Sequence, residues 1–140
     1  MEYKLKAIKQ DFKKAKIGSS KDAADYARNF YYDNLTIYES AFILMTNRSN
    51  NTIGFAKISQ GGVAGTVVDI KLVLKYAVQN IASGVIFVHN HPSGNLTPSN
   101  EDTGLTRRLK EALKMMDVTL LDSIILGENG YYSFADEGLL

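Results

Sequence analysis

The sequence predicts a single α/β or α+β domain in which helices pack on a mixed β-sheet. The chain has 140 residues, a length typical of one domain. Hydrophobic residues make up 45% and charged residues 22%, which is the composition of a globular protein with a core and not of a disordered chain. Strand-length apolar runs alternate with segments of helical period, and this alternation gives the fold class.

The first half of the chain predicts a helix followed by short strands. Ser20 is the expected N-cap of a helix over Lys21–Asn29. A polar turn at Asn47–Asn51 separates two apolar segments, as in a β-hairpin, and Gly61 marks a further break. The strands of this half are expected at Ala41–Met45, Thr52–Ile58 and Val63–Val68.

The second half predicts two amphipathic helices and three strands. Asp69 caps a helix over Ile70–Ile81, in which apolar side chains recur with a period of three to four. The continuous apolar run Val85–Val88 is typical of a buried central strand. A loop at His89–Pro98 then leads into a long helix over Ser99–Met116. The last two strands are expected at Val118–Leu126 and Tyr131–Phe134.

Composition and charge exclude several classes of protein. The chain has no cysteine, which removes disulfides, thiol nucleophiles and the cysteine-ligated zinc site of nucleobase deaminases. No apolar stretch reaches the roughly 20 residues of a membrane span, and the N-terminus lacks the apolar centre of a signal peptide. We therefore expect a cytoplasmic protein without a membrane partner.

The basic residues are unevenly distributed. Residues 1–18 hold six lysines against Glu2 and Asp11, a net charge of +4, whereas residues 19–140 carry 10 basic and 13 acidic residues, a net charge of −3. The sequence thus predicts a Lys-rich extension over residues 1–18, dispensable for folding, and a domain over residues 19–140. The charge of the domain does not support DNA as a partner, because each neutralised phosphate needs a Lys or Arg.

The two histidines of the chain, His89 and His91, follow the predicted central strand. Residues i and i+2 of an extended chain point to the same face, so both imidazoles can bind one metal ion. Asp102 lies in the first turn of the next helix and offers a third ligand. Two histidines, one carboxylate and an open position are typical of a catalytic zinc site. Alternatively, Ser99 and Asp102 form only a capping box for the helix.

A family resemblance rests on these residues. The string His89-Asn90-His91-Pro92-Ser93-Gly94, followed by Ser99-x-x-Asp102, resembles the JAMM (MPN+) metalloprotease signature. The match is closer still to RadC-like JAB domain proteins and covers residues 19–140, including residues 59–62, 121–127 and 131–138. The chain resembles the short form that lacks the helix-hairpin-helix domain typical of RadC proteins. A second departure is Ser123, where RadC proteins commonly have a histidine.

The resemblance implies a JAB/MPN-like fold of the cytidine deaminase-like type and a JAMM-type metalloprotease or isopeptidase. It implies one Zn²⁺ ion bound by His89, His91 and Asp102, with Glu39 as the general base and Ser99 holding the oxyanion. The reaction would be hydrolysis of an amide or isopeptide bond in a protein or peptide substrate through a zinc-bound water. Asn90 and Ser93 are weaker candidates for orienting the loop or binding substrate.

Two other functions stay open from the sequence. RadC-like proteins have long been labelled DNA repair proteins, so the chain could be a DNA-associated accessory of a mobile element that acts by binding. A metal-dependent nuclease is the other alternative. The near-neutral charge argues against both, and the complete set of ligands argues against a vestigial metal site.

Overall fold

A five-stranded mixed sheet forms the centre of the computed structural model, which describes residues 1–11, 13–32, 34–61 and 67–140. The strand order is β2-β1-β3-β4-β5. β3 and β4 run parallel, and the other neighbouring strands are antiparallel. The strands are β1 (Ser40–Thr46), β2 (Thr52–Gln60), β3 (Gly84–Asn90), β4 (Thr119–Leu126) and β5 (Tyr131–Ser133).

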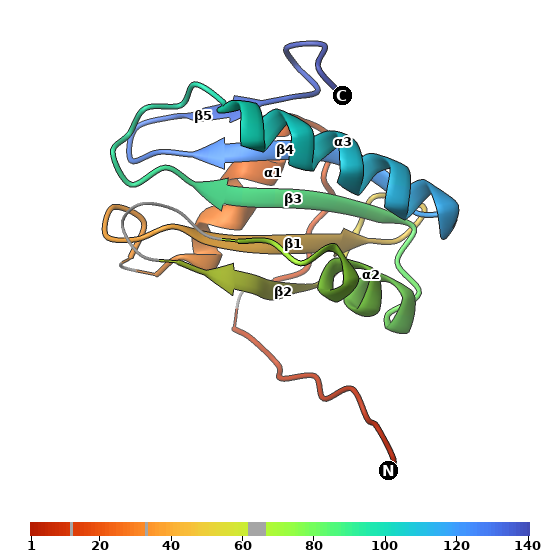
Figure 1. Cartoon of the computed structure of the whole chain (residues 1–140). Helices are drawn as coiled ribbons and strands as arrows, with labels where there is room; N and C mark the ends of the chain where they lie inside the picture. Colours follow the sequence, from red (N-terminus) through yellow and green to blue (C-terminus); the bar gives the residue numbers. More distant parts are fainter. Residues whose placement is uncertain (12, 33, 62–66) are drawn as a thin grey trace.

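Helices cover both faces of the sheet. The helix α1 (Ser20–Ala27), continued by the short η1 (Arg28–Phe30), lies behind the sheet in Figure 1. The helices α2 (Ile70–Gln79) and α3 (Asn100–Met115) lie in front of it. Two hydrophobic cores result, one between α1 and the sheet and one between the sheet and the α2–α3 pair. This single α+β domain is the architecture that the sequence predicts.

The central strands β1 and β3 are buried on both faces. Alternate side chains of a strand point to opposite faces. In β3, Val85 and Phe87 accordingly enter the core under α2 and α3, while Ile86 and Val88 enter the core under α1. Because each face of β3 lies in a hydrophobic core, consecutive residues of the strand are apolar, and the strand appears in the sequence as a continuous apolar run. A one-residue shift of register would turn the whole strand over, so its end is fixed relative to both cores.

The predicted elements agree with the structure except at three places. The N-cap of α1 is Ser19, whose hydroxyl accepts a hydrogen bond from the Asp22 amide at 3.1 Å. The hydroxyl of Ser20 is instead 2.5 Å from a carboxylate oxygen of Asp136. His89 and Asn90 belong to β3 and not to the loop, because pairing with β1 and β4 continues through them.

The third difference concerns the strand predicted at residues 63–68. Residues 63–66 lie outside the described part of the chain, and Val67 and Val68 are in no strand.

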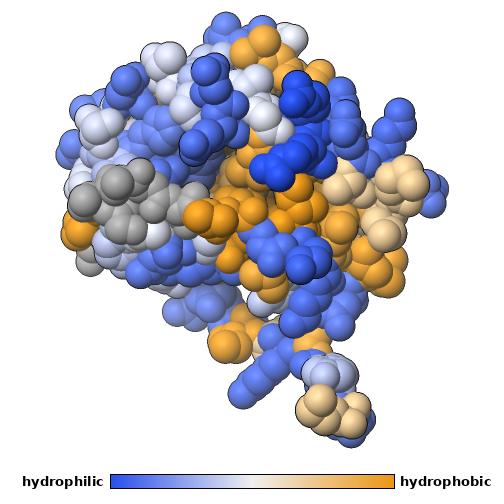
Figure 2. Space-filling view, in the orientation of Figure 1, coloured by the Kyte–Doolittle hydropathy of each residue, from blue (hydrophilic) through white to orange (hydrophobic). Residues whose placement is uncertain are grey.

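The face shown in Figure 2 has hydrophobic side chains gathered between α3 and α2. The partly buried Leu74 and Leu105 pack there against the core. No helix within the described ranges has the length and apolar character needed to cross a bilayer.

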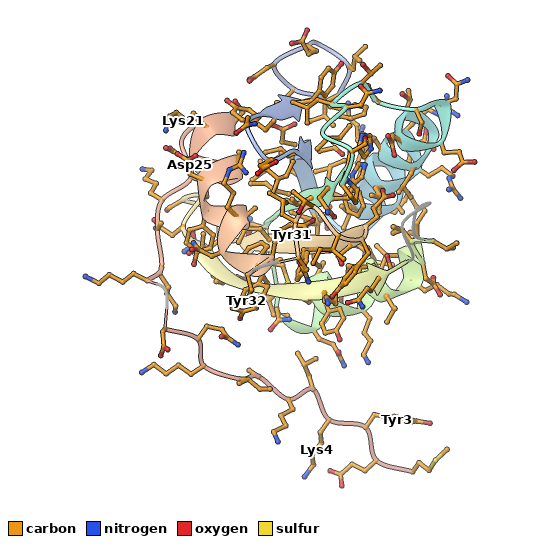
Figure 3. All side chains as sticks on the ribbon, turned by 90° about the vertical axis from the view of Figure 1, so that its left-hand side faces the viewer. Tyr3, Lys4, Lys21, Asp25, Tyr31 and Tyr32 are labelled. Carbon is orange, nitrogen blue, oxygen red and sulfur yellow. The ribbon has the colours of Figure 1, made fainter. Side chains whose placement is uncertain are left out.

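Among the described residues, the end of the Lys-rich extension is hydrogen-bonded to the domain. Residues 1–11 have no regular structure and extend away from the body, with Tyr3 and Lys4 projecting outward (Figures 1 and 3). In contrast, the Ile17 amide donates to the Asn50 carbonyl at 2.8 Å, and the Thr52 amide donates to the Ala15 carbonyl at 2.8 Å. The Ile17 side chain is 7% exposed and joins the core under α1. We therefore expect only the residues before Ala15 to be dispensable for folding, and not all of residues 1–18.

We predict that a chain beginning at Ala15 melts at the same temperature as the full chain. A chain beginning at Ser19 loses the buried Ile17 side chain, which contributes about 2 kcal/mol. Its midpoint should fall by roughly 5–10 °C. Thermal unfolding followed by circular dichroism measures both, and equal midpoints for the two shortened chains would contradict this account of Ile17.

Candidate metal centre

The two histidines lie where β3 ends, at the left-hand edge of the sheet in Figure 1. His89 pairs with Ala41 of β1 and with Ile125 of β4 and is 4% exposed. The His91 amide donates to the Leu126 carbonyl at 3.0 Å, so the strand geometry persists one residue beyond β3. The two rings therefore share a face, with centroids 5.1 Å apart. This is the juxtaposition that the H-x-H spacing predicts.

Asp102 reaches both imidazoles with its two carboxylate oxygens. Oδ1 lies 3.1 Å from Nε2 of His89, and Oδ2 lies 3.2 Å from Nε2 of His91. Burial would raise the pKa of this carboxyl group, yet its contacts with the two imidazoles hold the pKa well below its usual value. Contact with Asp102 in turn raises the pKa of His91.

The first turn of α3 fixes the direction of Asp102. The Ser99 hydroxyl accepts from the Asp102 amide at 3.0 Å, and Asp102 Oδ2 accepts from the Ser99 amide at 2.9 Å. The capping box predicted from the sequence is therefore present. It does not compete with the second role of Asp102, since the same carboxylate faces the histidines. Ser99 itself is exposed, and its role in holding an oxyanion stays a prediction.

The residues present fit a small divalent cation. Both ring nitrogens of His89 are buried; Nδ1 has no hydrogen-bond partner among the described residues, and Nε2 lies 3.1 Å from Asp102 Oδ1 without the geometry of a hydrogen bond. Leaving such nitrogens buried is costly unless a ligand binds. Nδ1 of His91 lies 2.6 Å from the Asn95 carbonyl oxygen, which orients Nε2 as the metal-binding nitrogen. In a tetrahedral zinc site, neighbouring ligand atoms lie roughly 3.3–3.6 Å apart. The distances from Asp102 to His89 and His91 are close to that range.

Glu39 completes the cluster from the residue before β1. Its Oε1 lies 4.0 Å from Nε2 of His89, and its side chain is 17% exposed. Burial raises the pKa of Glu39, and the two histidines oppose that rise. One ligand atom each from Glu39, His89 and His91 lie within 4.8 Å of one another, a group that could hold a metal ion. The structure thus places Glu39 beside the histidines, where either a base or a ligand could act.

The loop between β3 and α3 packs, through Leu96, against the turn between β4 and β5, away from the two histidines. A Cβ atom added at Gly127 would lie 2.9 Å from Cδ2 of Leu96, and one at Gly130 would lie 3.3 Å from Cδ1. The turn between β4 and β5 therefore packs closely against the Leu96 side chain at both glycines. Arg28 fixes this turn by donating to the Gly127 carbonyl at 2.9 Å and the Gly130 carbonyl at 3.0 Å.

These supporting contacts are largely invisible to an analysis of residue spacing. The Asn95 contact uses a backbone carbonyl, which any residue carries. For the packing of Leu96 against the turn, the two glycines are the sequence feature that indicates a close contact. Ser93 is exposed, and its hydroxyl accepts from the Asn95 amide at 3.3 Å. Ser123, where RadC proteins commonly have histidine, is buried in β4 and accepts from the Thr106 hydroxyl at 3.1 Å. Its polar group is thus satisfied by α3.

Comparison with known proteins agrees with the fold and the motif. A family model described as the RadC-like JAB domain matches residues 17–139. A UPF0758 protein of Flavobacterium johnsoniae is 44% identical over 124 residues, which cover 89% of this chain and 53% of that protein. A UPF0758 protein of Clostridium acetobutylicum is 37% identical over 139 residues, covering 98% of this chain and 58% of that protein.

A third relative is also longer than this chain. The UPF0758 protein of Porphyromonas gingivalis is 43% identical over 103 residues, covering 73% of this chain and 45% of that protein. The chain thus spans about half the length of the curated relatives it matches, and their names state no activity. The match covers both histidines, Asp102 and Glu39, and it includes nearly all of the sheet and its three helices. The chain belongs to the RadC-like JAB domain family.

Proposed function

We propose that this chain is a zinc-dependent hydrolase of the JAMM type that cleaves an amide or isopeptide bond in a protein or peptide. The observation that carries the proposal is the position of the Asp102 carboxylate, 3.1 Å and 3.2 Å from the Nε2 atoms of His89 and His91. A partly buried carboxylate that lies between two imidazoles is typical of the donor set of a catalytic zinc site.

His89, His91 and Asp102 would hold the ion. A zinc ion bound there would supply a Lewis acid that polarises the scissile carbonyl and lowers the pKa of a bound water. The imidazole of His91 is already oriented by the Asn95 carbonyl, and the carboxylate of Asp102 by the Ser99 amide. Little rearrangement of these side chains is needed on binding, so the site is preorganised.

Glu39 would move the proton. Its carboxylate accepts a proton from the attacking water, whose oxygen bonds to the carbonyl carbon. The C–N bond then breaks, and Glu39 returns the proton to the leaving amine. The raised pKa of Glu39 suits both steps, because a base whose pKa lies closer to the working pH can accept and release a proton. The hydroxyl of Ser99 keeps its hydrogen free to donate to the developing oxyanion.

DNA is the partner that the charges support least. The domain over residues 19–140 has a net charge of −3, from 10 basic and 13 acidic residues. Binding to duplex DNA that weakens steeply as salt rises would favour the DNA-associated alternative. We propose a protein or peptide substrate instead, since the hydrolysis of an amide or isopeptide bond needs no basic surface on the protein.

We predict that replacing His89 and His91 together by alanine abolishes zinc binding and leaves the chain folded. Elemental analysis after dialysis against trace zinc measures the bound ion, and circular dichroism measures the fold. The matched control is Glu101→Gln, which removes an exposed carboxylate from the same turn as Asp102 and should retain one equivalent of zinc. One equivalent of zinc in the double variant would contradict the assignment of the ligands.

We predict that Glu39→Gln keeps its zinc and loses turnover by about 10²–10⁴-fold, because glutamine cannot accept the proton. A library of internally quenched peptides, together with peptides joined through a lysine isopeptide bond, supplies the substrates for the zinc-loaded chain. Loss of zinc from this variant would make Glu39 a ligand. No cleavage of any library member by the zinc-loaded native chain would count against the hydrolase itself.

A further inference from the structure

The asparagine between the two histidines is directed away from the metal centre. Asn90 is 0% exposed and, by the alternation of the strand, points to the α1 face of the sheet. Its Oδ1 accepts from the Ser40 amide at 2.8 Å. Its Nδ2 donates to the Leu35 carbonyl at 2.6 Å and to the Tyr38 carbonyl at 2.9 Å. The amide group is thus fully engaged, so Asn90 has no polar atom to offer a substrate.

The three partners of Asn90 all belong to the segment that carries Glu39. The Tyr38 carbonyl and the Ser40 amide flank Glu39 directly, so both neighbours of the candidate base are tied to β3. Two further hydrogen bonds hold the backbone of this segment. The Gly61 amide donates to the Glu39 carbonyl at 2.9 Å, and the Tyr31 hydroxyl donates to the Ser40 carbonyl at 2.8 Å. Figure 3 shows Tyr31 inside the molecule and Tyr32 at its surface.

We propose that Asn90 is a positioning residue that fixes the carboxylate of Glu39 relative to the two histidines. The inference rests on the proposed function. One residue of β3 holds the backbone on either side of Glu39, and its immediate neighbours are His89 and His91. Asn90 thus links the backbone beside Glu39 to the strand that carries His89, whose Nε2 lies 4.0 Å from Glu39 Oε1. A misplacement of about 1 Å at a reacting group can cost 10²-fold in rate.

The chemistry of the contacts requires asparagine. The Ser40 amide needs an acceptor, and the carbonyls of Leu35 and Tyr38 need donors. Aspartate keeps the acceptor but directs a second oxygen at two carbonyls, and serine is too short to reach all three groups. Glutamine adds a methylene to a side chain with no exposed surface. An amide on a one-carbon stem meets all three demands.

The test compares Asn90→Asp with Ser133→Ala in the full chain. Ser133 is a matched control because it is also buried and donates one side-chain hydrogen bond, at 2.5 Å to Asp122, in β5 and away from Glu39. The first readout is amide hydrogen exchange of the metal-free proteins. Asn90→Asp should speed exchange over residues 34–40 at least tenfold, and Ser133→Ala should leave that segment unchanged.

The second readout is the visible spectrum of the cobalt(II)-loaded proteins as a function of pH. Asn90→Asp should bind one equivalent of cobalt, because β1 and β4 still hold His89. Because the new carboxylate of Asn90→Asp can itself move the spectral midpoint, the midpoint is measured in the uncharged variant Asn90→Ser, where it should shift by at least one pH unit in the same direction as in Glu39→Gln. Combining the two changes should add nothing further. A purely structural role would lower stability without moving this midpoint, as we expect for Ser133→Ala.

Each outcome decides the proposal. Unchanged exchange over residues 34–40 in Asn90→Asp would overturn it, and so would fast exchange there together with a native midpoint in Asn90→Ser. If the native chain binds no cobalt, or Glu39→Gln leaves the midpoint in place, the proposed function itself fails. Fast exchange in Asn90→Asp would then show only a residue that stabilises the fold, and the positioning role would be rejected.

Discussion

The end of strand β3 is the constraint on which the site depends. β3 lies between an antiparallel neighbour, β1, and a parallel neighbour, β4, and both faces of the strand are buried. A one-residue slip of its register would exchange its side chains between the two cores and disrupt the packing of both. The alternation of the strand then sends His89 and His91 to the α3 face and Asn90 to the α1 face. One three-residue segment thereby directs two imidazoles to the candidate metal centre and holds the segment that carries Glu39 by hydrogen bonds.

The groups at this end are costly for a folded chain to bury. His89 has two buried ring nitrogens without hydrogen-bond partners in the described part of the chain, and Glu39 is a largely buried carboxyl with a raised pKa. A chain selected for stability alone would replace such groups by apolar ones. Their retention beside a carboxylate of lowered pKa is typical of a functional site. The surrounding fold offsets the cost with two hydrophobic cores.

The sequence predicts the fold and the cluster well because both follow from local periodicity. The apolar run before His89 indicates the central strand, the H-x-H spacing places both rings on one face, and Ser99-x-x-Asp102 marks the helix start. Glu39 could not be found this way, since an acidic residue before a strand is most often solvated, and only the family resemblance singled it out. Tertiary packing creates the contacts of Asn90 with residues 35–40 and the close contact of Leu96 with Gly127. No spacing in the sequence encodes them.

We propose that His89, His91 and Asp102 bind the metal and that Glu39 acts beside it as a base. Anomalous diffraction at the zinc edge from crystals of the zinc-loaded chain tests this most directly. The account predicts one peak within about 2.0–2.2 Å of Nε2 of each histidine and of one oxygen of Asp102, with Glu39 beyond bonding distance. A peak bonded to Glu39 in place of Asp102, or no peak between the histidines, would contradict it.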